Sequence, residues 1–309
     1  MIAMRTKKVS GLPVTVNKGD TYVPETPENC PSGRQVSIFC GRRNSGKTTA
    51  CASLIEKMGY DRLFLVSPTA LSNQGMVARL KIAPEDIYDP NEPGVLRLII
   101  DEVERERDDY ERYVEEMKRW KQFVRQLKRD DPVFSIPDEV LLTFFKDGEF
   151  KKPFHKYGGR KPFIGVLFDD CLGSRLFTKD IRLLNATVIL HRHVAAFNNE
   201  PGAIGLDMYF LTQAWKSNVG TLPPVIRNQC TTLLVFKTKS EKELQSIQEE
   251  IGGEVDKETF YRIYEYCTQG RHDFMFIDMF PKEGLHPSPY RKNLDEFVIP
   301  ENFSGTDTT

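Results

Sequence analysis

The segment Gly41–Thr48, with the sequence GRRNSGKT, constrains the fold more than any other stretch because it fits the pattern G-x-x-x-x-G-K-[ST]. A strand-like run, QVSIFC, precedes it, and a stretch with helical spacing, TTACASLIEKM, follows it. Glycine lets the backbone N–H groups close around an anion, and the start of the helix presents its positive end to the same charge. The sequence therefore predicts a phosphate-binding loop formed by Gly41, Arg42, Arg43, Asn44, Ser45, Gly46, Lys47, Thr48 and Thr49.

A second signal is the apolar run FIGVLFDD, which ends in Asp169 and Asp170. In a nucleotide site of this kind, the lysine of the loop (Lys47) reaches the β- and γ-phosphates, and the hydroxyl of Thr48 together with a strand-end acid holds Mg²⁺. We expect Asp169 to be the metal ligand and Asp170 to orient or deprotonate an attacking water. ATP and Mg²⁺ are the expected cofactors, and an adjacent acid favours hydrolysis over transfer to a second substrate.

Further strand-like runs predict the fold class. Residues 62–68 form an apolar run that ends at a proline, and residues 206–213, 231–236 and 273–278 are also strand-like. Of the four strand-like runs from residue 163 onward, three are apolar without strict alternation, which is typical of strands buried on both faces. Helical stretches separate them, so we expect an α/β fold with at least six strands in a mostly parallel sheet flanked by helices. Gln213 ends one of these runs, and strand ends at the carboxyl edge face the ligand crevice. An amide there is placed to sense the γ-phosphate and hold the water.

The charge balance excludes a uniformly basic nucleic-acid-coating protein. Lys and Arg total 43 and Asp and Glu total 44, which gives a formal net charge of −1. A long helical stretch, 101–129, carries nine acids in residues 101–116 and six bases in residues 117–129. Residues 146–161 carry six bases interleaved with aromatic side chains and are one candidate for sequence-independent DNA contact. A solvated connection whose aromatic side chains cover the domain edge is the alternative for this segment. The loop 198–205 is a second candidate; it has no basic residue, so it would steer DNA in a central pore rather than attract it.

Several other classes lack support. The six cysteines form no C-x-x-C pair, so a zinc site is disfavoured and reduced cysteines are expected. The N-terminus has no apolar segment typical of a secretion signal, and no window is apolar over 18 residues, so we expect a soluble protein without a membrane span.

Taken in order, GRRNSGKT, LVSPT, VLFDD, FLTQ and LPPVIRNQ resemble the poxvirus-type genome-packaging ATPases of nucleocytoplasmic large DNA viruses. These are P-loop ATPases of the FtsK–HerA superfamily, with an ASCE, RecA-like fold. The resemblance covers residues 35–278 and implies a homo-oligomeric ring that pumps double-stranded DNA into a capsid, with a capsid or portal partner. It also implies a location in the host cytoplasm (the viral factory) and in the virion.

The same resemblance implies an arginine near the γ-phosphate. Arg227, in the matched IRNQ stretch, is the first candidate, and Arg192, in HRH, is the second. About a dozen residues separate Arg192 from the next strand, which is longer than the family pattern. A surface position on an ordinary helix is the alternative reading of Arg192.

The expected organisation is an N-terminal extension (1–29), an ATPase domain (30–280) with a long charged helical insertion (about 84–160), and a C-terminal tail (281–309) that packs loosely or reaches a neighbour. Three alternatives to a packaging motor stay open. They are a cellular-type DNA translocase or helicase of the same superfamily, a small-molecule kinase or nucleotide switch, and an assembly protein that uses ATP only to hold its shape.

Overall fold

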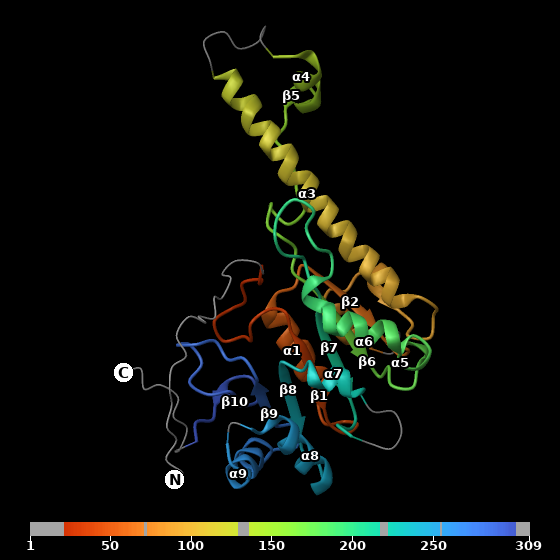
Figure 1. Cartoon of the computed structure of the whole chain (residues 1–309), viewed down its shortest axis with the longest axis vertical. Coiled ribbons are helices and arrows are strands. Elements are labelled where there is room, and N and C mark those ends of the chain that lie inside the picture. Colours follow the sequence, from red (N-terminus) through yellow and green to blue (C-terminus); the bar gives the residue numbers. More distant parts are fainter. Residues whose placement is uncertain (1–21, 71–72, 129–135, 217–221, 254, 301–309) are drawn as a thin grey trace, which may run out of the picture.

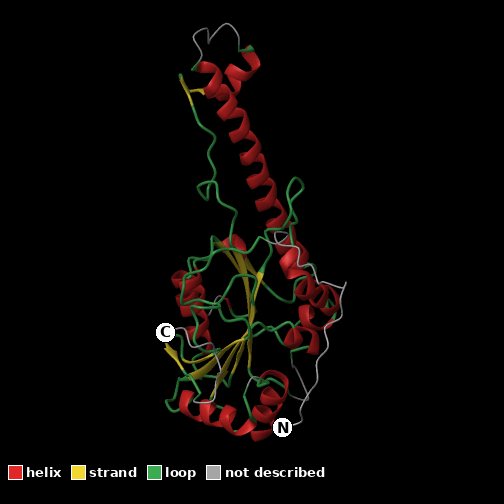
Figure 2. Ribbon diagram, turned by 60° about the vertical axis from the view of Figure 1, so that its left-hand side comes forward, coloured by secondary structure: helices red, strands yellow, loops and turns green. Residues whose placement is uncertain are grey.

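The computed structural model describes residues 22–70, 73–128, 136–216, 222–253 and 255–300. Within these ranges a nine-stranded sheet, in the order β11-β10-β9-β8-β1-β7-β6-β2-β3, runs through the centre of the molecule between layers of helices (Figures 1 and 2). The predicted α/β class with a mostly parallel sheet is confirmed. The strands of the sheet are β1 (Val36–Cys40), β2 (Arg62–Val66), β3 (Ile87–Tyr88), β6 (Ile164–Asp169), β7 (Asp207–Thr212), β8 (Thr232–Phe236), β9 (Phe274–Asp278), β10 (Tyr290–Lys292) and β11 (Glu296–Phe297).

The six strands from β8 to β3 are parallel, and β9, β10 and β11 extend this block by antiparallel pairing. One strand, β7, lies between β1 and β6. The strand that precedes the predicted phosphate loop and the strand that ends in the acids are therefore separated by one parallel strand.

Helices cover both faces of the sheet because both faces of its strands are apolar. On one face α1 (Lys47–Met58) and α2 (Gln74–Arg79) pack on side chains such as Phe39, Leu167 and Tyr209. The opposite face is covered by the beginning of α3 and by the helices that follow β6, β7 and β8. These are α5 (Arg175–Thr178), α6 (Ile181–Leu190) with η3 (His191–His193), α7 (Pro224–Asn228), α8 (Glu241–Ile251) and α9 (Lys257–Cys267).

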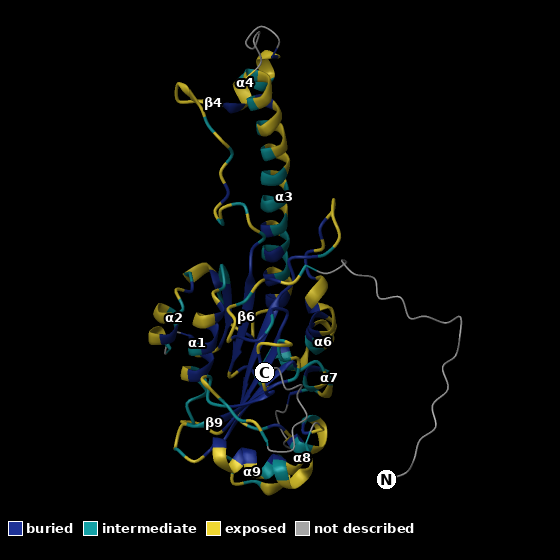
Figure 3. Cartoon of the chain, turned by 90° about the vertical axis from the view of Figure 1, so that its left-hand side faces the viewer, coloured by how far each residue is buried: buried dark blue, intermediate teal, exposed yellow. Residues whose placement is uncertain are grey.

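Helix α3 (Val95–Leu127) crosses one face of the sheet and then projects beyond it (Figures 1 and 3). It begins six residues earlier than the predicted start at residue 101, after Gly94 in a left-handed conformation (φ 78°). Val95, Leu96, Ile99 and Val103 are buried against the sheet, so this apolar stretch belongs to the helix. A short 3₁₀ turn, η2 (Pro84–Asp86), precedes β3.

The far end of α3 carries a small core of its own. Phe123 is fully buried between α4 (Asp138–Phe144) and a two-stranded ribbon of β4 (Phe145–Lys146) and β5 (Glu149–Phe150). This cluster is separate from the two clusters that sandwich the sheet. We call α3 from residue 107 onward, with α4, β4 and β5, the arm.

Of the predicted C-terminal tail (281–309), the described residues 281–300 include strands that join the sheet, and residues 301–309 lie outside the described ranges. β10 pairs with β9, and Tyr290 and Arg291 are almost fully buried. These strands were missed because they are only three and two residues long and show no periodic pattern.

The parallel block has two functionally different edges. The loop that follows β1 and the ends of β6 and β7 lie at its carboxyl edge. The arm returns to the sheet at Ile164, the first residue of β6, so the arm projects from the amino edge. The sequence-predicted basic segments 117–129 and 146–161, as far as they are described, therefore lie at the end of the sheet opposite the predicted phosphate loop.

Candidate active site

The loop between β1 and α1 has the close approach and the curvature that its glycines predict. A Cβ atom at Gly41 would lie 2.6 Å from the Cβ of Phe236 and 2.8 Å from the Oγ of Ser45, so only glycine fits there. Asn44 (φ 61°) and Gly46 (φ 101°) adopt left-handed conformations that curl the chain into the start of α1. Arg42, Arg43, Asn44 and Thr49 are exposed around this loop.

Lys47 and Thr48 open α1, where free backbone N–H groups and the helix dipole favour an anion. The Lys47 ammonium donates to the carbonyls of Gly41 and Arg42, the latter at 2.9 Å. Burial lowers the pKa of Lys47, while Cys40, Asp169 and Asp170 act in the opposite direction. Lys47 therefore lies within electrostatic reach of both strand-end acids.

Asp169 is the last residue of β6 and is 7 % exposed. Its Oδ2 accepts a hydrogen bond from Nδ2 of Asn73 at 3.1 Å. Burial, followed by the charge of Asp170, raises the pKa of Asp169, whereas Lys47 and Asn73 lower it. Asp170 is exposed and has a left-handed backbone (φ 54°), so its side chain leaves the direction of the strand.

Gln213 stands at the same edge, between the loop and the two acids. Thr212 pairs with Cys40 on one side, and Leu211 pairs with Asp169 on the other. The Gly41 N–H donates to the carbonyl of Thr212 at 3.1 Å, which ties the phosphate loop to the residue just before Gln213. Gln213 is exposed and, with Gly41 and Arg42, lines a small hollow.

The residues present fit a nucleotide and a hard divalent cation. Ser45 Oγ is buried and has no hydrogen-bond partner within the described part of the chain, so an oxygen of a bound phosphate would satisfy it. The Thr48 hydroxyl and the Asp169 carboxylate are the oxygen ligands that Mg²⁺ prefers. No group of three or more His, Cys, Asp or Glu residues suited to a metal occurs among the described residues.

The two candidate arginines lie in different surroundings. The side chain of Arg227 is 9 % exposed and is held inside the chain by Glu250 and by the carbonyl of Leu222. This enclosure counts against a role for Arg227 in a neighbouring subunit.

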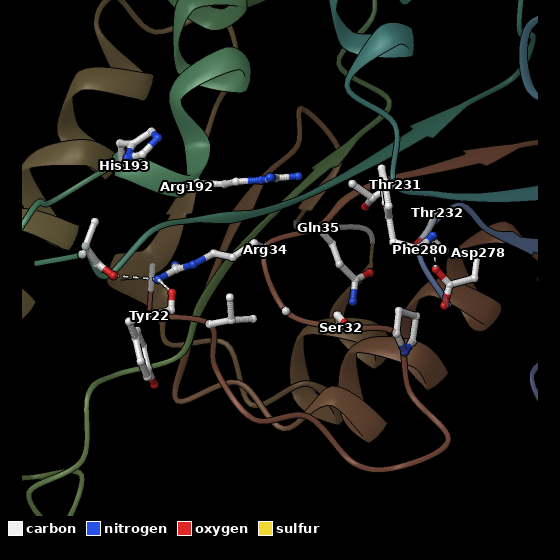
Figure 4. A pocket seen from close by; sticks show the side chains of 15 residues that line it. Tyr22, Ser32, Arg34, Gln35, Arg192, His193, Thr231, Thr232, Asp278 and Phe280 are labelled. Carbon is white, nitrogen blue, oxygen red and sulfur yellow. Dashed lines mark hydrogen bonds between the residues drawn. The ribbon is translucent and has the colours of Figure 1, made fainter. Parts of the chain in front are cut away.

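Arg192 is exposed and lies at the amino edge, over a cavity of about 390 Å³ bounded by Arg34, Gln35 and Thr231 (Figure 4). It is therefore remote from the phosphate loop of its own chain.

The basic segment 146–161 is less available for DNA than its composition suggests. Four of its six bases form ion pairs within the chain: Lys151 with Asp147, Lys156 with Glu106, Arg160 with Asp61, and Lys161 with Glu200. The loop 198–205 is hydrogen-bonded to α3, because Glu111 on this helix accepts hydrogen bonds from Asn198 at 2.7 Å and from the backbone N–H of Asn199 at 3.3 Å. Both segments serve in part to anchor the arm.

Three residues near the site escaped the sequence analysis. Asn73 contacts Asp169, Nδ1 of His272 donates to the carbonyl of Ser45 at 3.3 Å, and Glu243 contacts Cys40. None belongs to a local motif, since each reaches the site only through tertiary packing. His272 does so because β9 runs antiparallel to β8, which places the start of β9 at the carboxyl edge.

The remaining expectations concern the cysteines and a membrane span. All six cysteines are free, and five of them are buried. Of the helices in the described ranges, none combines the length and the apolar character needed to cross a membrane.

No family model and no curated protein matches this chain. It is similar to the solved genome packaging NTPase B204 of Sulfolobus turreted icosahedral virus 2 in complex with ATP-gammaS, with 11 % identity, coverage of 79 % of this chain and 91 % of that chain, and a TM-score of 0.37. It is also similar to the pCW3 conjugation coupling protein TcpA, with 13 % identity, 80 % and 57 % coverage and a TM-score of 0.34. A third similar structure is the cytoplasmic domain of the type VII secretion ATPase EccC of Thermomonospora curvata, with 13 % identity, coverage of 80 % of this chain and 24 % of that chain, and a TM-score of 0.33. At these TM-scores the likenesses carry no argument about substrate or partner.

Proposed function

We propose that this chain is an ATP-hydrolysing motor. The observation that carries the proposal is the convergence of Lys47, Asp169 and Gln213 at one edge of the sheet, each at the end or the continuation of a neighbouring parallel strand. A lysine on a phosphate loop, a buried acid and an exposed adjacent acid are the parts that hydrolysis of a nucleoside triphosphate needs.

The proposed reaction assigns one role to each residue. Lys47 and the N–H groups of the loop would bind the β- and γ-phosphates, and Thr48 and Asp169 would hold Mg²⁺. When bound, Mg²⁺ would neutralise charge on the phosphates. Gln213 orients the attacking water, and Asp170 accepts a proton from this water as the water oxygen bonds to the γ-phosphorus. The bond between the γ-phosphorus and the bridging oxygen breaks, which releases ADP and phosphate.

We further propose that the motor translocates double-stranded DNA, without reading its sequence, and packages it into a capsid. The order of the motifs in the sequence, which resembles that of packaging ATPases, supports this form of the proposal. The working unit is then a homo-oligomeric ring with a capsid or portal partner, active in the host viral factory and retained in the virion. In such a ring Arg192 is the better candidate to reach a neighbour's γ-phosphate, because Arg227 is enclosed.

Steady-state ATPase activity with and without long double-stranded DNA, together with the mass of the assembly in solution, tests this proposal. We expect an oligomer whose turnover rises on DNA. A monomer that hydrolyses ATP at a rate indifferent to DNA would point to a kinase or a nucleotide switch. Binding of ATP without any turnover would leave only a structural use of the nucleotide.

A further inference from the structure

The loop that follows β7 is held by two carboxylates of α8. The first is Glu243, whose Oε1 accepts the backbone N–H of Trp215 at 2.8 Å and whose Oε2 accepts the Thr238 hydroxyl at 2.7 Å. Its Oε1 also lies 3.7 Å from the thiol of Cys40, the residue before the phosphate loop. A single carboxylate thus contacts the last residue of β1 and the segments that follow β7 and β8.

The second carboxylate is Glu250, seven residues later and so on the same face of α8. Its Oε2 accepts the indole N–H of Trp215 at 2.9 Å and the Nε–H of Arg227 at 3.2 Å, and Lys216 pairs with Oε1. Burial raises the pKa of Glu250, but Lys216, Arg227 and Trp215 outweigh it, and the net shift is downward. The carboxylate is therefore ionised at neutral pH.

Arg227 completes this arrangement. Its guanidinium lies 5.7 Å from the centroid of the Trp215 ring and donates to the carbonyl of Leu222 at 2.8 Å. Trp215 is fully buried, so its indole is fixed by packing and by Glu250 together. Trp215 and Arg227 are consequently both held by Glu250 of α8.

Gln213 lies two residues before Trp215 and directly after Thr212, the last residue of β7. It shares a small hollow with Gly41, Arg42 and Glu243. The position of the Gln213 amide relative to the phosphate loop therefore depends on the backbone that Glu243 holds.

We propose that Glu243 and Glu250 are positioning residues for the reaction. Acting through Trp215 and Arg227, they hold Gln213 at the γ-phosphate and link α8 to the state of the nucleotide. The inference rests on the proposed ATP hydrolysis, which it deepens by assigning a function to residues that do not touch the nucleotide. It also gives Arg227 a role within its own chain.

The chain contains two tryptophans, so Trp120→Phe in the arm leaves Trp215 as the only one. In this background we expect Mg²⁺ and the slowly hydrolysed analogue ATPγS to change the Trp215 emission. Glu250→Ala should abolish that change while the affinity for a fluorescent ATP analogue stays within about twofold of the parent. In ATPase assays, Glu243→Ala and Glu250→Ala should lower kcat at least tenfold with little change in KM, and the Glu→Gln variants should recover part of the loss.

Two further variants keep the test decisive. Glu258→Gln removes an exposed ion pair with Arg262 on α9 and should change neither kcat nor the emission. Trp215→Phe keeps an aromatic ring at this position but removes the indole donor, so it should lower kcat even if Glu250→Ala does not fold.

The inference is overturned if Glu243→Ala and Glu250→Ala fold and keep both the parental kcat and the emission change. Failure of the parent chain to hydrolyse ATP would overturn the proposed function instead. The emission experiment would then still test whether the loop responds to bound nucleotide.

Discussion

Asp169 and Asp170 are consecutive in the chain but lie in opposite environments. Asp169 is buried at the end of β6 and hydrogen-bonded to Asn73, whereas Asp170 turns outward through a left-handed backbone. Burial and the charge of Asp170 raise the pKa of Asp169, so a bound cation would relieve the repulsion between them. The two acids are thus suited to different tasks.

Asp170→Asn should keep ATP binding and lose turnover, because we propose that the exposed acid is the proton acceptor. We expect kcat to fall by about 10²–10⁴ with nucleotide affinity little changed. Filter binding of labelled ATP beside a phosphate-release assay measures both. Normal hydrolysis by Asp170→Asn would remove this residue from the mechanism.

Lys47→Ala should abolish nucleotide binding without unfolding the protein. Its ammonium donates only to loop carbonyls in the described structure, and burial already lowers its pKa. ATPγS at 100 times its Kd should stabilise the parent by about 3 kcal/mol and leave Lys47→Ala unaffected, as measured by thermal unfolding. An equal stabilisation of both proteins would place the nucleotide elsewhere.

Mixing experiments should distinguish the two arginines. If the ring forms, Arg192→Ala subunits should poison the turnover of wild-type subunits, because Arg192 is exposed and remote from its own phosphate loop. Arg227→Ala should act by simple dilution and should lower the melting temperature, because it leaves Glu250 without one of its partners. The reverse pattern would restore Arg227 as the arginine that acts between subunits.

Asp207 should make stability depend on pH in the acid range. It is fully buried at the start of β7, where burial raises its pKa to about 6 although Tyr60 and Arg34 act against the shift. In the unfolded chain the Asp207 carboxyl has a pKa of about 3.9, so between about pH 4 and pH 6 only the folded state keeps the proton. The free energy of unfolding should therefore fall by about 3 kcal/mol as pH rises through this range. Urea unfolding across this range measures the slope, and Asp207→Asn should flatten it. Parallel profiles for the two proteins would contradict the assignment.

Phe123→Ala should loosen the arm while the sheet stays intact, because Phe123 packs with Phe144 and Phe150 in a separate core. Hydrogen exchange should accelerate in residues 138–150 and stay slow in β1 and β7. Phe210→Ala is the contrasting variant, because it removes a ring that stacks on Phe168 in the core on one face of the sheet. It should destabilise the whole domain by about 3–5 kcal/mol. Faster exchange throughout the Phe123→Ala chain would mean that the arm and the sheet unfold together.

The parts of the molecule that sequence could predict are those with local patterns. Each of the six predicted strands is found within one or two residues of its expected bounds, because short apolar runs bounded by turn residues are typical of buried strands. Lys47, Asp169 and Gln213 were placed at one edge for a topological reason, since the ends of parallel strands share that edge. Strands of two or three residues carry no such pattern.

Contacts between distant segments could not be predicted in this way. Arg227 meets Glu250 across 23 residues, and four bases of segment 146–161 meet acids of the same chain, three of them from other segments. Charge composition records how many such groups exist but not which of them are paired. The inward placement of Arg227 and the partial neutralisation of the basic segment therefore became visible only in three dimensions.

The attachment of α3 has a mechanical consequence. Glu106 on this helix forms ion pairs with Arg62, the first residue of β2, and with Lys156, in the chain that returns to the sheet. These ion pairs fix the helix at the point where it leaves the sheet. From Glu106 to Leu127 the helix extends about 30 Å at 1.5 Å per residue. A tilt of about 10° at that point would sweep the far end through about 5 Å, given this helical rise. Because this cluster of opposite charges lies nearer the start of the helix than its end, a small tilt about it would produce a several-fold larger displacement at Leu127 than one turn from the cluster.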